Sequence, residues 1–409
     1  MDLRYTPEYE SFRREVLGFL RDHWPLRGAD AARPQPEREA LFRQRAIERG
    51  YLYRSIPTKY GGSGQPPDIL RSNIILEEFS RAEAPGELSS QGAAMLVPTL
   101  LEKGSDAQKA EYIPPTLRGE LVWCQGYSEQ GAGSDLASIQ TRGELDGDEW
   151  VINGHKIWTS GAHETDMMFC LVRTEPDAGK HAGISYLLID MKSPGIRVGT
   201  LMQMTRSEEF CEVFFDDVRV PAENIVGKRG EGWAVSRATL MHERNLIGSS
   251  DRMRANFQAL VDLARKVERN GRPAIEDPHV RQRLAAIQGY VATQVYLGHR
   301  TLTAVARGEL PGIEALMIKL NSTNIGHQIS KLALDLIGDG ALEAPSSVVY
   351  SPVDDGEHAS WLGDYMWSLG IATAGGTANI QRNIIAERGL GLPRERAANL
   401  GPQGPTDTG

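Results

Sequence analysis

The sequence predicts an α+β protein of several domains: a helical N-terminal domain, a small central β-barrel or sandwich, and a C-terminal four-helix bundle. Three observations predict it. The chain has 409 residues, too many for one ordinary hydrophobic core. Apolar residues recur at helical spacing in its first and last parts. Between them, short runs rich in β-branched and aromatic residues alternate with turn signals. We expect domains at 1–120, 121–228 and 229–396, and a disordered tail at 397–409.

The N-terminal region shows the start and the period of helices. Pro7 followed by acidic residues is typical of a helix start. The apolar residues that follow fall at helical spacing: Phe12, Val16, Phe19 and Leu20. A further helix is predicted over 69–81, after the Gly- and Pro-rich segment 60–67.

The central region has the pattern of short strands. Its runs are EWVINGHKIWTSG, DMMFCLVRT, GISYLLIDM and FCEVFFDDVRV. Turns are expected at Asp146-Gly147-Asp148 and at Asn153-Gly154, because Asn-Gly is the strongest short hairpin signal. These features predict a small all-β domain.

Helical period returns after residue 232. A first helix is predicted over 236–267, and long helices follow over 278–307, 312–338 and 361–388. Helices of this number and length predict a bundle. The tail 397–409 contains little apolar material, so we expect it to be disordered.

Charge and composition exclude several classes of protein. The net charge of −9 argues against a nucleic-acid binder, which usually has a basic face. The 3 cysteines have neither zinc-site nor redox-pair spacing, so we expect no metal and a reducing, cytoplasmic setting. The N-terminal segment is charged and amphipathic, unlike a signal peptide. The sequence contains no run of about 18 apolar residues, so we expect no membrane span.

Four segments could carry chemistry, and each also has an ordinary structural interpretation. The loop within 123–135 is rich in glycine, which lets backbone amides approach an anion or a ring. Segment 153–161 alone predicts a hairpin and an amphipathic strand with Trp158 in the core. Segment 230–244 predicts a glycine turn and a helix with a solvated charge pair. Segment 374–388 predicts a turn that caps a helix.

In this order, on a helix–β–helix chain, the four segments resemble the acyl-CoA dehydrogenase family over roughly residues 5 to 395. The resemblance implies an oligomeric flavoprotein of lipid metabolism that holds FAD between the β domain and the bundle. The implied reaction converts an acyl-CoA to the trans-2-enoyl-CoA. A carboxylate takes the α proton, flavin N5 takes the β hydride, and an electron-transfer flavoprotein accepts the electrons.

The family's site residues carry over at matching positions. Contacts with FAD are implied for residues of the first, second and fourth segments: Gln125, Tyr127, Ser128, Trp158, Ser160, Thr377 and Asn379. Contacts with the substrate are implied for Ser134, near the pantetheine arm, and Arg244, near the CoA moiety.

The chain departs from the common pattern at the catalytic base. Many members place a glutamate two residues before the threonine of the fourth segment, where this chain has Gly375. Glycine cannot take a proton, although its amide can still polarise the thioester carbonyl. A minority of the family places the base on the first bundle helix, directly before the CoA-contacting arginine. That position is Glu243, which we expect to be the base; outside the family context it would be an ordinary exposed helix glutamate.

Two further departures concern contacts that a neighbouring subunit usually makes with FAD. The region 269–278 lacks the usual Arg-x-x-Phe motif, and Asp335 stands near the place of a glutamine that lies by the diphosphate. An ionised aspartate there would repel the diphosphate. We therefore keep two arrangements: a homodimer or homotetramer, and a heterotetramer in which this chain is the catalytic or the partner subunit. A same-fold oxidase, or a dehydrogenase of carrier-bound acyl groups, is a further alternative.

Overall fold

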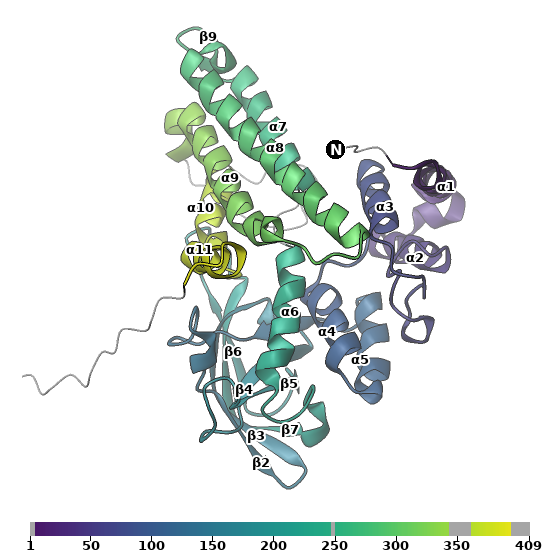
Figure 1. Cartoon of the computed structure of the whole chain (residues 1–409), viewed down its shortest axis with the longest axis vertical. Coiled ribbons are helices and arrows are strands. Elements are labelled where there is room, and N and C mark those ends of the chain that lie inside the picture. The colour runs from purple at the N-terminus through teal and green to yellow at the C-terminus, as the bar shows by residue number, and fades with distance from the viewer. Residues whose placement is uncertain (1–4, 247–249, 343–360, 394–409) are drawn as a thin grey trace, which may run out of the picture.

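The computed structural model describes residues 5–246, 250–342 and 361–393, and the side chains of 242–251 lie outside that description. The predicted tail 397–409 also lies outside the described residues. Figure 1 shows N-terminal helices on one side, a β domain at the bottom and a group of long helices at the top. The α+β architecture predicted from the sequence is confirmed. No helix among the described residues is long and apolar enough to cross a membrane.

The N-terminal region is helical, as predicted. Its helices are α1 (Pro7–His23), α2 (Gln35–Glu48), α3 (Ile69–Arg81), α4 (Val97–Lys103) and α5 (Asp106–Arg118). The helix α1 buries the apolar stripe named from the sequence, Phe12, Val16, Phe19 and Leu20. The helix α3 is capped by Asp68, whose carboxylate accepts hydrogen bonds from the amides of Leu70 and Arg71.

The β domain is one curled sheet of seven strands. The strands are β1 (Trp123–Gly126), β2 (Arg142–Asp146), β3 (Glu149–Ser160), β4 (Met167–Arg173), β5 (Ile184–Asp190), β6 (Ile196–Leu201) and β7 (Phe210–Pro221). They pair in the order β1-β4-β2-β3-β7-β6, and β5 pairs with β4. The strand β1 runs parallel to β4, while β3 pairs antiparallel with β7.

The two turns expected in this domain have different outcomes. The turn around Gly147 is confirmed: it joins β2 to β3, and Gly147 has φ +67°. The turn predicted at Asn153-Gly154 is wrong, because β3 continues past these residues with a bulge. Gly154 has φ +155°, and a Cβ there would lie 2.5 Å from Oγ1 of Thr141. The glycine therefore serves a bulge and a close strand approach rather than a hairpin.

Among the described residues, six α-helices follow the sheet. They are α6 (Gly232–Leu246), α7 (Ser250–Lys266), α8 (Pro278–Ala306), α9 (Ile313–Ile337), α10 (Trp361–Ile371) and α11 (Ala378–Ile384). The helices α7, α8, α9 and α10 pack together as a four-helix group. A short hairpin of β8 (Glu268–Arg269) and β9 (Arg272–Pro273) joins α7 to α8.

The single helix predicted over 361–388 is wrong. A turn separates α10 from α11, and within it Gly375 and Gly376 have φ +60° and +92°. Two consecutive left-handed residues cannot belong to a right-handed helix, and glycine adopts this conformation without steric cost.

One hydrophobic core joins the N-terminal helices to the sheet. It runs from residues of α1 and α3 to Phe169 of β4, Tyr186 of β5 and Val235 of α6. A second cluster fills the inside of the curled sheet and contains the three unpaired cysteines, Cys124, Cys170 and Cys211. The helix α6 thus packs on both the sheet and the N-terminal helices, as Figure 1 shows at the centre of the molecule.

We predict that Gly154→Ala lowers the thermal midpoint and reduces the free energy of unfolding by about 1–3 kcal/mol, because the new methyl group overlaps Thr141. Gly199→Ala is the matched control: Gly199 lies in β6, where a Cβ meets nothing within 4 Å. Differential scanning calorimetry of both variants measures the effect. Equal midpoints for the two variants would contradict the role assigned to Gly154.

Candidate functional site

A buried ion pair holds the glycine-rich loop that follows β1. The Lys156 side chain is 0% exposed, and its Nζ lies 2.8 Å from Oε1 of Glu129. The same amine donates to the carbonyl of Tyr127 at 3.2 Å. Glu129 also accepts from the backbone amides of Gln140 at 2.6 Å and Thr141 at 3.0 Å. The pair therefore fastens both ends of the loop to β3.

The charge state of Glu129 follows from its partners. Burial by itself raises the pKa of Glu129, but the charge of Lys156 and the hydrogen bonds from Lys156 and Gln140 outweigh it and hold that pKa below the ordinary range. The carboxylate is thus ionised at neutral pH. A buried carboxylate of this kind is stable only with its cation and its donors in place.

Trp158 lies next to this loop with its ring unburied. The amide of Ile157 donates to the carbonyl of Ser128 at 2.9 Å, so the loop and β3 are in contact at this point. Trp158 follows within a bulge of β3, has φ +63° and is 57% exposed. The core position that the strand pattern alone predicted is therefore wrong. A left-handed backbone at a bulky residue stores about 1–3 kcal/mol and is typical of functional sites.

An aromatic series connects Trp158 to the C-terminal helices. The ring of Trp158 meets the ring of Phe210 edge-on at 5.8 Å. Phe210 in turn stacks with Trp367 of α10, at 6.4 Å and an interplanar angle of 10°. Because α10 leads into the turn at 372–377, the series brings the second and fourth sequence segments to the same region. Figure 1 shows α11 at this junction of the β domain and the C-terminal helices.

The other residues of the first two segments take different positions. Gln125 lies in β1, and its Nε2 is buried with no hydrogen-bond partner among the described residues. Tyr127 is a core residue between Phe169 and Tyr186, which leaves its backbone as the part that can reach a bound group. Ser160 ends β3 opposite Phe210.

Ser134, the expected pantetheine contact, lies in the loop between β1 and β2. It is exposed there.

The helix α6 is anchored at its beginning by the glycines of the third segment. The amide of Gly230 donates to Oγ of Ser185 at 2.9 Å, and a Cβ on Gly232 would lie 2.4 Å from the backbone of Ser185. Further along, Oγ1 of Thr239 lies 3.0 Å from Oγ1 of Thr99 and 3.4 Å from the hydroxyl of Tyr186. These contacts fix α6 against both β5 and α4.

Glu243 and Arg244 lie in α6, one helical turn after Thr239, and their side chains lie outside the described part of the chain. The structure therefore fixes the backbone on which the expected base stands. Their contacts with a substrate stay a prediction.

The fourth segment forms the turn between α10 and α11. Thr377 caps α11, since its hydroxyl accepts from the amide of Ile380 at 3.2 Å. Asn379 is exposed, and its side chain accepts from Arg382. Gly375 lies in the turn itself, where its carbonyl accepts from Gln381 at 3.1 Å.

These observations fit a planar, hydrogen-bonding cofactor such as the flavin ring. Trp158 offers an exposed aromatic surface, and the buried Nε2 of Gln125 is a donor without a partner among the described residues. Oγ1 of Thr159, next to Trp158, is likewise buried and unpartnered within that part of the chain. Buried polar groups in folded proteins almost always have partners, so these two atoms and the exposed indole are features that a bound polar ring would use.

Sequence reasoning missed the residues that hold the site together. Lys156 and Glu129 lie inside the quoted segments, yet neither was assigned a role. A signal existed for Lys156, because it occupies a buried position of β3, at an even spacing from Ile152. A lysine at an inward strand position requires a buried acid.

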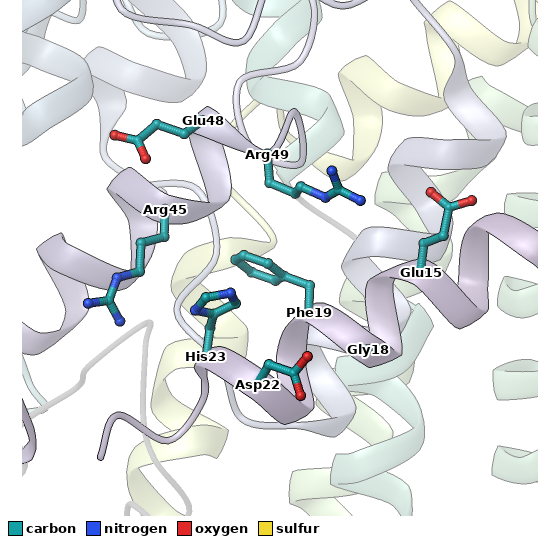
Figure 2. A pocket seen from close by; sticks show the side chains of 8 residues that line it. All are labelled: Glu15, Gly18, Phe19, Asp22, His23, Arg45, Glu48 and Arg49. Atoms are coloured by element: carbon teal, nitrogen blue, oxygen red, sulfur yellow. The ribbon is translucent and has the colours of Figure 1, made fainter. Parts of the chain in front are cut away.

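A separate hollow of 530 Å³ lies between α1 and α2, on the opposite side of the molecule from α11. Figure 2 shows acids and arginines around it, with the Phe19 ring between the two helices. Its lining residues are Glu15, Gly18, Phe19, Asp22, His23, Arg45, Glu48 and Arg49. Arg45 is paired with Asp30 outside the hollow. None of the residues expected in the site lines it.

Comparisons with known proteins identify the same family as the order of the four segments. The chain matches three family models, described as the N-terminal domain (residues 6–120), middle domain (124–218) and C-terminal domain (230–390) of acyl-CoA dehydrogenase. Acyl-CoA dehydrogenase IpdE1 of Mycobacterium tuberculosis is 38% identical over 95% of this chain and 99% of its own length.

Solved structures show the same fold over nearly the whole chain. The structure described as "Tcur3481-Tcur3483 steroid ACAD" has a TM-score of 0.74 at 30% identity, over 97% of this chain and 100% of its own. The ChsE4-ChsE5 complex of Mycobacterium tuberculosis has a TM-score of 0.74 at 26% identity, with the same coverage.

We predict that Lys156→Met destabilises the protein by about 3–5 kcal/mol, because it leaves the buried Glu129 carboxylate without its cation. Lys180→Met is the matched control. Its amine also pairs with a carboxylate of the same loop, Asp135, but that pair is largely exposed and should change stability by less than about 1 kcal/mol. Urea unfolding compares them, and an effect of Lys156→Met no larger than that of the control would refute the role of the buried pair.

We predict a specific acid dependence of this pair. Folding lowers the pKa of Glu129, so the pair adds stability above the unfolded pKa, about 4.3, and loses it as the pH falls through the lower folded pKa. The stability gap between the wild type and Glu129→Gln should therefore be widest at neutral pH and narrow below about pH 4. Thermal midpoints across pH 3 to 7 measure the gap. A gap that stays constant over this range would contradict the prediction.

Proposed function

This chain belongs to the acyl-CoA dehydrogenase family of oxidoreductases, and we propose that it binds FAD and removes two hydrogens from an acyl-CoA thioester. The product is the trans-2-enoyl-CoA. The observation that carries the proposal is Trp158, an exposed indole on a left-handed backbone. Ring contacts through Phe210 and Trp367 link it to α10, the helix that leads into the turn at 372–377.

The cofactor would be held between the β domain and the C-terminal helices. Trp158 would cover the flavin ring, and Gln125, Ser128 and Ser160 would hydrogen-bond its polar edge. Thr377 and Asn379 would contact it from α11, and Tyr127 would contribute through its backbone. FAD, when bound, supplies the acceptor for the hydride that leaves the β carbon.

The chain's own residues would handle the proton and the thioester. We assign the α proton to the Glu243 carboxylate, and the CoA moiety to Arg244, with Ser134 near the pantetheine arm. The anchoring of α6 by Gly232 and Thr239 supports this assignment, because a general base needs a rigid backbone under it. The amide of Gly375 would donate a hydrogen bond to the thioester carbonyl oxygen, where negative charge develops as the α proton leaves.

For the acyl group we propose a bulky, ring-bearing substrate. One solved structure at 30% identity is described as a steroid ACAD, which favours an acyl chain attached to a fused-ring system. The reduced cofactor would pass its electrons to an electron-transfer flavoprotein. Rapid reoxidation of the reduced flavin by oxygen would instead support the oxidase alternative.

An assembly of two different chains is the second candidate. The descriptions of two similar structures join two chain names, which supports a heterotetramer as an alternative to a homodimer or homotetramer. Asp335, near the place of the usual diphosphate-side glutamine, pairs with Arg283 of α8 at 2.5 Å. That ion pair offsets the charge of Asp335 but adds no net positive charge for a diphosphate. Co-expression with a homologous subunit, followed by size-exclusion chromatography and flavin content, separates the two assemblies.

We predict that Glu243→Gln keeps FAD and binds the acyl-CoA, but slows anaerobic flavin reduction by about 100-fold or more, because the amide cannot accept the α proton. Glu268→Gln, at an exposed position of β8, is the control and should behave as the wild type. Stopped-flow absorbance measures reduction. Unchanged reduction rates in Glu243→Gln would remove this residue from the mechanism.

A further inference from the structure

A buried lysine of α9 reaches the turn that carries Gly375. Lys319 is 3% exposed. Its Nζ donates to the carbonyl of Gly376 at 2.9 Å and to the carbonyl of Ala372 at 3.4 Å. The amine therefore joins the second turn of α9 to the segment that follows α10. A positive charge at this place also faces the negative end of the α10 helix dipole, which favours the contact.

A second buried side chain binds the same turn. Gln381 of α11 is 3% exposed, and its Nε2 donates to the carbonyl of Gly375 at 3.1 Å. The approach is close, since a Cβ on Gly376 would lie 2.7 Å from that nitrogen. Three carbonyls of the turn, those of Ala372, Gly375 and Gly376, are thus held by two side chains.

The direction of the carbonyls decides the direction of the amides. In a trans peptide unit, the N–H of the next residue points opposite to the C=O. Since Gln381 and Lys319 bind the carbonyls of Gly375 and Gly376, the amides of Gly376 and Thr377 point away from those two side chains. A carbonyl bound to an ammonium group is also polarised, which strengthens its peptide N–H as a donor.

We propose that Lys319 is a positioning residue of the active site, which orients the 372–377 turn through the carbonyls of Ala372 and Gly376. The inference rests on the proposed function, in which this turn faces the flavin and the thioester. Where other members place a glutamate, this chain has glycine at 375, so the turn contributes backbone donors alone. Two of those donors, the amides of Gly376 and Thr377, then take their direction from Gln381 and Lys319, and the amide of Gly375 lies between the held carbonyls of Ala372 and Gly375.

The test compares three variants of α9. Lys319→Met removes the ammonium group at similar length, Lys319→Arg keeps a cation, and Lys331→Met changes an exposed lysine of the same helix. The first readout has two parts: the rate of anaerobic flavin reduction, and the KM for a steroid-type or branched acyl-CoA. The second is hydrogen exchange of the 372–377 amides in the protein as purified, which needs no substrate.

We expect Lys319→Met to slow flavin reduction about tenfold or more while KM changes less than about threefold, because the donors matter most in the transition state. Exchange should speed up in the 372–377 peptide and stay unchanged in α8. Lys319→Arg should restore part of the rate, and Lys331→Met should match the wild type. Wild-type rates and exchange in Lys319→Met would overturn the proposal.

Two further outcomes are also decisive. If Lys319→Met does not fold, Lys319→Arg and Gln381→Met take its place, and wild-type behaviour of both would overturn the proposal. If the wild type itself is reduced by no acyl-CoA, the proposed function fails. In that case the exchange measurement still decides whether Lys319 holds the turn.

Discussion

The buried ion pair between Lys156 and Glu129 is the constraint on which the site depends. It takes two charges out of water, and this is tolerable only because backbone groups of Tyr127, Gln140 and Thr141 complete their hydrogen bonds. In return, the loop after β1 cannot move independently of β3. Ser128 is then held at Ile157, and the bulge that exposes Trp158 follows directly. The pair thus fixes the loop against the strand that carries Trp158.

The remaining parts of the site are tied to this piece by packing. Gly230 and Gly232 let α6 start against β5, and Thr239 connects it to α4, so the backbone of Glu243 is set relative to the sheet. Phe210 and Trp367 carry the contact from Trp158 to α10. A region where the β domain, α6 and α10 meet beside an exposed aromatic ring suits a cofactor that fills the junction.

Much of the fold could be predicted from the sequence, because strong periodicity marks helices such as 69–81 and strands such as those in the middle region. The misses share a physical cause: tertiary contacts override local signals. Asn153-Gly154 is a hairpin signal, yet Gly154 lies within β3, where only a residue without a side chain fits against Thr141. Trp158 has the pattern of a core residue, yet a bulge turns it outward. Which residues form the site could be inferred only from the order of the four segments along the chain. Lys156 and Lys319 bind groups far away in sequence, which no local pattern reports.

The proposed dehydrogenation is tested most directly by anaerobic reduction of the purified flavoprotein with a panel of acyl-CoAs that have straight, branched and ring-bearing chains. We expect the visible flavin band to bleach with at least one of them and the product to be the trans-2-enoyl-CoA. Deuterium at either the α or the β carbon should slow the bleaching. A protein that carries FAD but bleaches with none of the panel, alone or with a homologous subunit, would contradict the proposed dehydrogenation.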